Sequence, residues 1–244
     1  MCLIALAYKA HPRYPFIFAA NRDEFLDRPA APAHFWEDAP DILAGCDLQA
    51  GGTWMGITRA GRFAAITNFR DLRRSQRTDG PSRGLLVRDA LEHAIDPRAT
   101  QVYNGFNLIH GPLDALRYHN NIEPADIPLS PGIHSLSNHF LDTPWPKVEH
   151  ATAAMERLLQ GPDEQLVPGL FALLRDDVPA SDERLPDTGL PRDLERVVSS
   201  IFIDSPGYGT RCSTVVLMDI DGRVWFEERT WPEGSVVMEK MSIR

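Results

Sequence analysis

Residues 2–8 read Cys2-Leu3-Ile4-Ala5-Leu6-Ala7-Tyr8, and residues 15–20 read Pro15-Phe16-Ile17-Phe18-Ala19-Ala20. Between these two apolar runs, His11-Pro12-Arg13 is typical of a turn. Continuous apolar runs of this length, bounded by turn residues, are typical of buried strands. We therefore expect the chain to begin with two buried strands joined by a short turn.

The remaining sequence carries strand signals, then helix signals, then strand signals again. We expect strands at 51–57, 63–68, 107–110, 115–119, 132–138, 214–219 and 224–229, and helices at 82–95, 148–160, 164–175 and 192–202. Residues 26–50 and 176–192 are rich in Pro and Asp and are expected to be loops, the first with short extended pieces. Strands and helices in separate runs predict an α+β fold with sheet and helix layers, and we treat residues 1–244 as one domain.

Composition excludes several classes of protein. The 244 residues carry 25 Lys and Arg against 34 Asp and Glu, a net charge of −9, which argues against nucleic-acid binding because phosphates need a basic face. No apolar run approaches about 18 residues, so we expect no membrane span. Three cysteines make no disulfide framework, and the N-terminus lacks the basic start of a secretory signal, so we expect a cytoplasmic protein.

Common cofactor and metal motifs are missing from the sequence. There is no phosphate-binding loop of the GxxxxGK[ST] type, no GxGxxG, no CxxC, no HExxH and no GxSxG, and the eight histidines are scattered. We therefore expect neither a cofactor nor a built-in catalytic metal.

Cys2 is the residue with the clearest chemical potential. Aminopeptidases remove Met1 before a small residue, which would leave a thiol and a free α-amine together on Cys2. An α-amine has a pKa near 8, so it can act as a base for the neighbouring thiol. The alternative is an ordinary apolar cysteine at the start of a core strand, and a retained Met1 would block the amine.

Two groups of charged residues interrupt this apolar pattern. Residues 21–24 read Asn-Arg-Asp-Glu directly after the second apolar run, which could also be a solvated strand end. Residues 70–83 form a locally basic loop in an acidic chain, with arginines at Arg70, Arg73, Arg74, Arg77 and Arg83. This loop is either an ordinary solvated surface or a rim that attracts carboxylates or phosphates, for which Arg70, Arg73 and Arg74 are the candidate binding residues.

Several motifs together resemble one known family. They are Cys2-Leu3-Ile4, Ala20-Asn21-Arg22-Asp23-Glu24-Phe25, Gly51-Gly52-Thr53-Trp54-Met55-Gly56, Thr67-Asn68 and Tyr208-Gly209-Thr210-Arg211. In this order they resemble the NRDE family, the family of the transport-and-Golgi-organisation protein, over nearly the whole chain. That family is in turn similar to cysteine-type N-terminal nucleophile (Ntn) hydrolases such as bile-salt hydrolase and penicillin V acylase. The resemblance implies a four-layer αββα sandwich, in which two antiparallel sheets are flanked by helices.

The resemblance also implies roles for individual residues. Cys2 resembles the nucleophile, Asn68 the asparagine of an oxyanion hole, Asn138 a second asparagine near the nucleophile, and Asp23 the aspartate that orients the N-terminal amine. The hydrolases carry Arg-Asn-x-Asp on the second strand. Aligning Asn21 and Asp23 with it puts Ala20 at their arginine.

Another arginine could take that place. Arg22 lies two residues after Ala20, so on a strand it would face the same side. Arg211 could also supply a guanidinium near the site.

Two functions follow from these residues. One is hydrolysis of a linear amide or acyl bond through a thioester on the N-terminal cysteine, without a metal. The other is non-catalytic binding and trafficking of an amphipathic anionic ligand such as haem, acyl-CoA or a lipid, on the same fold. A small-molecule ligand is expected in both cases, and neither the substrate nor the oligomeric state can be read from the sequence.

Overall fold

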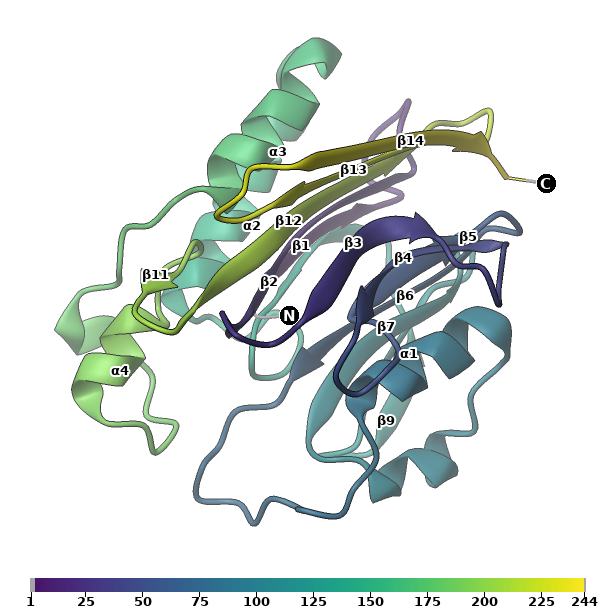
Figure 1. The fold of residues 1–244 in the computed structure, drawn as a ribbon. Helices are drawn as coiled ribbons and strands as arrows, with labels where there is room; N and C mark the ends of the chain where they lie inside the picture. The colour runs from purple at the N-terminus through teal and green to yellow at the C-terminus, as the bar shows by residue number, and fades with distance from the viewer. Residues whose placement is uncertain (1–2, 244) are drawn as a thin grey trace.

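The computed structural model describes residues 3–243, whose strands form two seven-stranded antiparallel sheets (Figure 1). The first sheet has the order β10-β1-β2-β12-β13-β14, with β11 beside β12, and the second runs from β3 to β9 in chain order. The first sheet contains β1 (Leu3–Tyr8), β2 (Phe16–Phe25), β10 (Gly132–Leu136), β11 (Asp204–Ser205), β12 (Tyr208–Met218), β13 (Arg223–Thr230) and β14 (Val236–Ser242). The second contains β3 (Ala30–Phe35), β4 (Ile42–Asp47), β5 (Met55–Thr58), β6 (Arg62–Asn68), β7 (Phe106–Pro112), β8 (Arg117–Asn120) and β9 (Ala125–Pro128).

Helices cover the outer faces of both sheets. They are α1 (Arg83–Glu92), α2 (Pro146–Leu159), α3 (Leu166–Leu174) and α4 (Arg192–Val197), with short 3-10 turns η1 (Pro97–Val102), η2 (Asp163–Gln165) and η3 (Asp182–Arg184). Side chains of α2 and α3 pack on β1, β2 and β12, and those of α1 pack on the second sheet. Helices α2 and α3 therefore lie on one side of the stacked sheets and α1 on the other, as Figure 1 shows.

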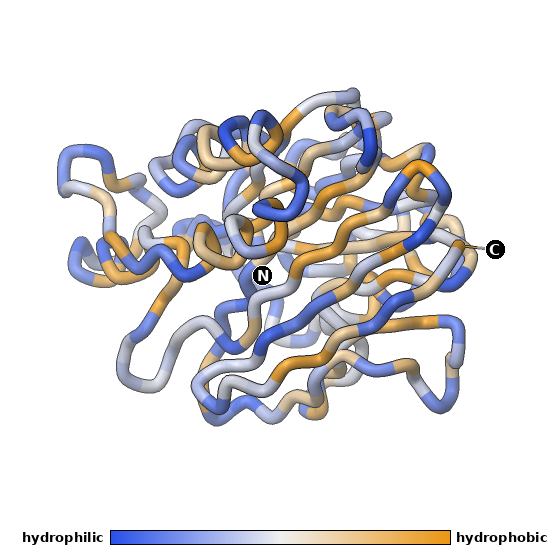
Figure 2. The backbone as a smooth tube through the Cα atoms, turned by 90° about the horizontal axis from the view of Figure 1, so that it is seen from above, coloured by the Kyte–Doolittle hydropathy of each residue, from blue (hydrophilic) through white to orange (hydrophobic). Residues whose placement is uncertain are grey.

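A third apolar cluster fills the space between the two sheets. Phe16 and Phe18 of β2 stack edge-on against Phe63 of β6, with centroids 4.9 Å apart in both pairs. In Figure 2 the orange, apolar segments lie mainly along the strands, while blue segments dominate the peripheral loops. The expected α+β sandwich of two antiparallel sheets flanked by helices is confirmed.

Several expected elements are confirmed and some expectations were wrong. The hairpin at 51–68 is β5 and β6, and the helix at 82–95 is α1, with Ser82 as its N-cap accepting a hydrogen bond from Gly84 N–H. Residues 26–50 were expected to be loop with short extended pieces, and the extended pieces are the six-residue strands β3 and β4. Strand β2 continues through residues 21–24 to Phe25, so this polar stretch is no solvated strand end. Strands β9, β11 and β14 were not expected.

Candidate functional site

Strand β2 sends alternate side chains to opposite faces of the first sheet. Ile17 and Ala19 pack in the cluster under the helices, whereas Phe18 and Ala20 pack in the cluster between the sheets. Arg22 follows Phe18 and Ala20 on the inner face, the side expected from its spacing to Ala20. Adjacent residues of the 21–24 stretch therefore serve different environments.

Asn21 is fully buried on the helix side, and its side chain is fully used there. Its amide nitrogen donates to the carbonyls of Leu174 at 2.8 Å and Ile201 at 2.9 Å, and its oxygen accepts from the Ser213 hydroxyl at 2.7 Å. Asn21 thus fastens the end of α3 and the segment before β11 to the first sheet.

Arg22 points between the sheets and is only 5% exposed. Its guanidinium lies over the Trp54 ring, 4.4 Å from the centroid, and approaches Asp47 at 3.8 Å and Glu24 at 4.0 Å. Its Nη1 atom is buried and has no hydrogen-bond partner among the described residues. A buried guanidinium donor without an acceptor is costly, which singles out this atom within the network.

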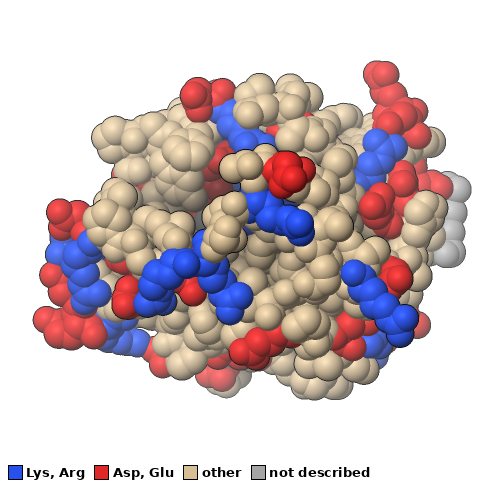
Figure 3. Space-filling model, turned by 90° about the horizontal axis from the view of Figure 1, so that it is seen from below, with Lys and Arg blue, Asp and Glu red and all other residues tan. Residues whose placement is uncertain are grey.

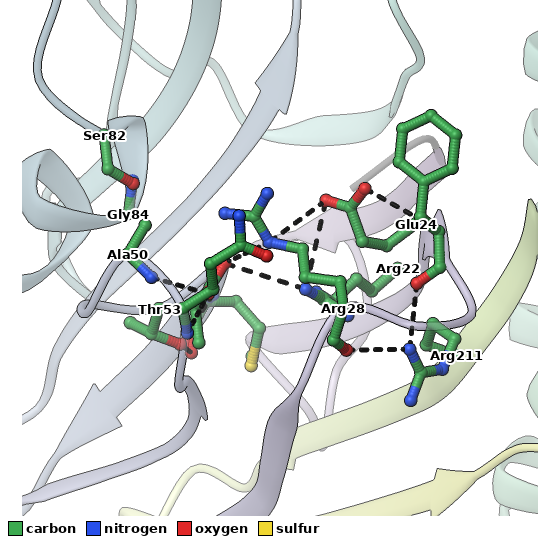
Figure 4. A network of polar contacts seen from close by, with 12 residues as sticks. Arg22, Glu24, Arg28, Ala50, Thr53, Ser82, Gly84 and Arg211 are labelled. Carbon is green, nitrogen blue, oxygen red and sulfur yellow. Dashed lines mark hydrogen bonds and ion pairs between the residues drawn. The ribbon is translucent and has the colours of Figure 1, made fainter.

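Arg28 completes a charged network with the same two carboxylates (Figure 4). Its Nε donates to Asp47 at 2.9 Å and lies 3.7 Å from Glu24. Two guanidinium groups therefore share two carboxylates, which leaves the cluster close to neutral.

A cavity of about 540 Å³ opens beside this network, and we call it the Arg22 pocket. Its lining comes from the end of β2, the loop after β4, the end of β6 and the loop before α1. The lining residues are Arg22, Asp23, Glu24, Arg28, Asp47, Gln49, Ala50, Thr53, Trp54, Ile66, Asn68, Arg77, Thr78, Gly80, Pro81, Ser82, Arg83, Gly84 and Asn104. Three of the predicted site residues, Arg22, Asp23 and Asn68, thus meet at one pocket.

Asp23 and Asn68 differ in how tightly they are held. Asp23 is buried, and its Oδ1 accepts a hydrogen bond from the Thr210 hydroxyl at 2.7 Å, while its Oδ2 has no partner among the described residues. Asn68 is the last residue of β6 and is exposed. The pocket lining therefore includes a buried carboxylate and an exposed amide side chain.

Asn138 and Arg211 do not line the Arg22 pocket, but they donate hydrogen bonds to segments that border it. The Asn138 amide donates to the Asn68 carbonyl at 3.0 Å. Arg211 lies where the register between β12 and β2 shifts, and its Nη1 donates to the carbonyls of Phe25 and Arg28, both at 3.0 Å (Figure 4). These contacts hold the end of β6 and the turn that carries Arg28.

The arginines singled out as anion-binding residues also lie outside the lining of the pocket. Arg70 pairs with buried Glu195 at 3.3 Å, and Arg73 pairs with Asp71 at 2.9 Å. Arg74 is 3.7 Å from Asp71. It is Arg77 and Arg83, from the same loop, that line the pocket. In Figure 3 basic and acidic side chains alternate on the face shown instead of forming one basic patch.

Glu228 lies behind Arg22 and was missed by sequence reasoning. It is 1% exposed, accepts the Ala33 N–H at 2.7 Å and the Thr214 hydroxyl at 3.2 Å, and lines a cavity of about 20 Å³ together with Arg22. Burial raises the pKa of Glu228. Glu228 lies within a run of three charged residues, 227–229, and such a run is typical of an exposed strand end. The local sequence therefore gives no sign that this carboxylate is buried.

Three residues that contact Arg22, namely Glu24, Asp47 and Trp54, were also not named as site residues. Glu24 and Trp54 lie within the sequence motifs quoted above, which could have pointed to them, whereas Asp47 lies in no such motif. A larger cavity of about 650 Å³ beside α2 contains none of the predicted site residues.

The predicted nucleophile, Cys2, lies outside the described residues. Among residues 3–243 no three His, Cys, Asp or Glu side chains come together as a possible metal site. No helix in this part of the chain is long and apolar enough to cross a membrane.

Comparison with solved structures finds chains with low sequence identity. The N-acylethanolamine-hydrolyzing acid amidase ortholog of Caenorhabditis elegans is 11% identical with a TM-score of 0.47, covering 88% of this chain and 92% of that one. A mutant of the conjugated bile acid hydrolase from Clostridium perfringens is 9% identical with a TM-score of 0.49, covering 99% of this chain and 92% of that one.

Sequence comparison is more decisive. The Transport and Golgi organization protein 2 homolog of Bos taurus is 37% identical over 94% of this chain and 93% of its own length. The Homo sapiens homolog is 34% identical over the same shares, and the Drosophila melanogaster protein is 26% identical over 94% and 92%. The model of the family described as Transport and Golgi organisation 2 matches residues 1–233. This chain therefore belongs to the Transport and Golgi organisation 2 family.

Proposed function

We propose that the chain hydrolyses a linear amide or acyl bond, with the thiol of Cys2 as nucleophile after Met1 has been removed. The observation that carries the proposal is the pairing of Leu3 with Asn21 at the start of β1. Leu3 is the first described residue of β1, and its pairing partner Asn21 directly precedes Arg22 and Asp23 on β2. Both side chains have a buried polar atom without a partner in the described chain.

The proposed reaction combines Cys2 with residues that line the Arg22 pocket. The α-amine of Cys2 takes the thiol proton, the sulfur attacks the acyl carbon, and the Asn68 amide donates to the oxyanion. The protonated amine gives its proton to the leaving nitrogen as the C–N bond breaks, which leaves a thioester on Cys2. Water then attacks the thioester with the amine as base, which releases the acid and restores the thiol.

Asp23 and Arg22 have distinct roles in this proposal. The free oxygen of Asp23 would accept a hydrogen bond from the α-amine and so orient it. The Arg22 guanidinium would stabilise the Cys2 thiolate, because a nearby cation lowers the pKa of a thiol.

The first experiment compares the three cysteines of one chain. The purified protein is treated briefly with limiting iodoacetamide at neutral pH and analysed by intact mass and peptide mapping. Burial raises the pKa of Cys46 and raises that of Cys212 further, so both are poor thiolates and serve as internal controls.

We expect Met1 to be absent and Cys2 to be alkylated well before both controls. A Cys46→Ala variant should keep this rapid reaction, and a Cys2→Ala variant should lose it. A retained Met1, or a Cys2 no faster than Cys46, would overturn the hydrolase proposal.

A second candidate function is binding of an amphipathic anionic ligand, such as haem, acyl-CoA or a lipid, without catalysis. It is favoured by one specific feature, the presence of Arg77 and Arg83 beside Arg22 and Arg28 in the same pocket. Titration with a long-chain acyl-CoA tests it. Arg77→Glu should weaken binding at least tenfold, whereas Arg73→Glu, outside the pocket, should not, and equal effects would argue against this pocket as the ligand site.

A further inference from the structure

The two sheets end in four edge strands, and three of these edges are blocked. Strand β3 contains Pro32 and a register shift between Ala31 and His34. Strand β9 has four residues and ends at Pro128. On β10 the N–H and C=O of Ser135 are both bonded to Asp142 of the following loop, at 2.7 and 2.9 Å. Such devices are how proteins prevent unwanted pairing of sheet edges.

Strand β14 has none of these three devices among residues 3–243, and Lys240 is the one edge lysine on it. Its seven residues contain no proline, and all seven pair with β13 in one unbroken register from Arg223↔Ser242 to Arg229↔Val236. In the order of the first sheet it is the last strand, with no partner on its outer side among residues 3–243 (Figure 1). Val236 and Met238 are 53% and 49% exposed on it.

The outward backbone groups of β14 can be assigned from its two ends. Thr230 N–H donates to Ser235 O at one end and Ile243 N–H donates to Gly222 O at the other. Antiparallel pairs alternate between bonded and non-bonded, so both ends place the N–H and C=O groups of every second residue towards solvent. These are the groups of Val236, Met238, Lys240 and Ser242.

We propose that β14 pairs antiparallel with the β14 of a second copy of this chain, joining the two first sheets across a twofold axis at Met238. A twofold axis normal to the sheet places one residue opposite its own copy. An axis at Glu239 or Lys240 would oppose like charges, which destabilises a pair. An axis at Met238 opposes two thioethers and still pairs residues 236–240.

The local charge of β14 permits a second copy as the occupant, although two copies with a net charge of −9 each repel elsewhere. The charges on β14 are those of Glu239 and Lys240, which cancel. A self-complementary neutral strand is what a closed twofold interface requires.

The first test is the mass in solution. Light scattering during size-exclusion chromatography over a range of concentrations should give twice the 27.3 kDa of one chain. Met238→Lys places two cations at the axis and should return the protein to monomer with an unchanged circular dichroism spectrum. Ile127→Lys is the matched control, because Ile127 is 51% exposed on the blocked edge β9, and it should leave the dimer intact.

The second test is cross-linking under mild oxidation, with the wild-type chain as background for its own cysteines. Met238→Cys should form a disulfide-linked dimer, because Cα atoms of a bonded antiparallel pair lie about 5.5 Å apart. Lys240→Cys should not, because its copies would be offset by about 13 Å along the strands. A monomer at all concentrations, open-ended aggregates, a dimer indifferent to Met238→Lys, or stronger cross-linking at position 240 would each overturn the proposal.

Discussion

The glycine pair at 51–52 offers a matched test of how the wall of the Arg22 pocket is built. Both residues have positive φ, +71° at Gly51 and +74° at Gly52. They differ in what a methyl group would meet. A Cβ on Gly52 would lie 2.3 Å from the backbone C and O atoms of Gly84 at the start of α1, whereas the nearest atom for Gly51 is Leu85 Cδ2 at 3.8 Å.

The expected costs follow from these distances. Alanine at either position must adopt the left-handed backbone conformation, which lowers the free energy of unfolding by about 1 kcal/mol. Gly51→Ala meets nothing else, so about 1 kcal/mol is the whole loss. Gly52→Ala must also push helical backbone away, which adds about 1–3 kcal/mol by the usual cost of overpacking. For a chain of this size, about 1 kcal/mol shifts the melting temperature by about 2–4 °C.

Urea denaturation of the two variants measures this difference directly. Gly52→Ala should lose about 2–4 kcal/mol of unfolding free energy, and Gly51→Ala about 1 kcal/mol. Because Thr53 N–H donates to Gly84 O at 3.1 Å, the clash also displaces the contact between the 51–53 loop and the helix that lines the pocket (Figure 4). Equal losses in the two variants would refute the close backbone contact.

Two further predictions concern buried polar side chains, Asn21 and Glu228. Asn21→Ala leaves two buried carbonyls and the Ser213 hydroxyl without their partner and should lower the free energy of unfolding, measured in urea, by about 3 kcal/mol. Asn68→Ala changes an exposed side chain and should lower it by no more than about 0.5 kcal/mol, and comparable losses in the two variants would contradict these assignments. Burial raises the pKa of Glu228, so the associated stability is present at acid pH and is lost as pH rises through the folded-state pKa. Glu228→Gln removes this ionisation, so its melting temperature relative to wild type should rise from pH 4 to pH 8, and a constant difference would speak against a titrating Glu228.

The parts of the fold that sequence could predict are those with an unbroken apolar signal. Strand β1 and the first half of β2 are continuous apolar runs, and they became the centre of the first sheet. Helix α1 had a Ser82 N-cap and an apolar stripe, and the structure places both as expected. In each case local pattern and tertiary burial agree, which is why the pattern sufficed.

Strands β3 and β14 lack that agreement. Strand β3 reads Ala-Ala-Pro-Ala-His-Phe and is only partly buried, so its strand character comes from pairing with β4 and not from its own residues. Strand β14 has a charged pair at its centre and exposed alternate residues, which resembles a solvated tail. The arginine loop was visible as a composition, but which arginines turn towards the pocket depends on loop geometry that no local pattern encodes.

The stretch from Asn21 to Glu24 acts as a connection between two layers of the fold. With a strand period of two, Asn21 turns to the helices and Arg22 turns to the space between the sheets. A shift of the strand register by one residue would bury the guanidinium under α3 and turn the amide towards the space between the sheets. Such a shift would therefore break the Asn21 hydrogen bonds and the Arg22 contacts together. The same register places Leu3 of β1 opposite Asn21. The Asn21 hydrogen bonds tie β2 to the helix layer, so a change that loosens α3 should reach the Arg22 side of the same strand.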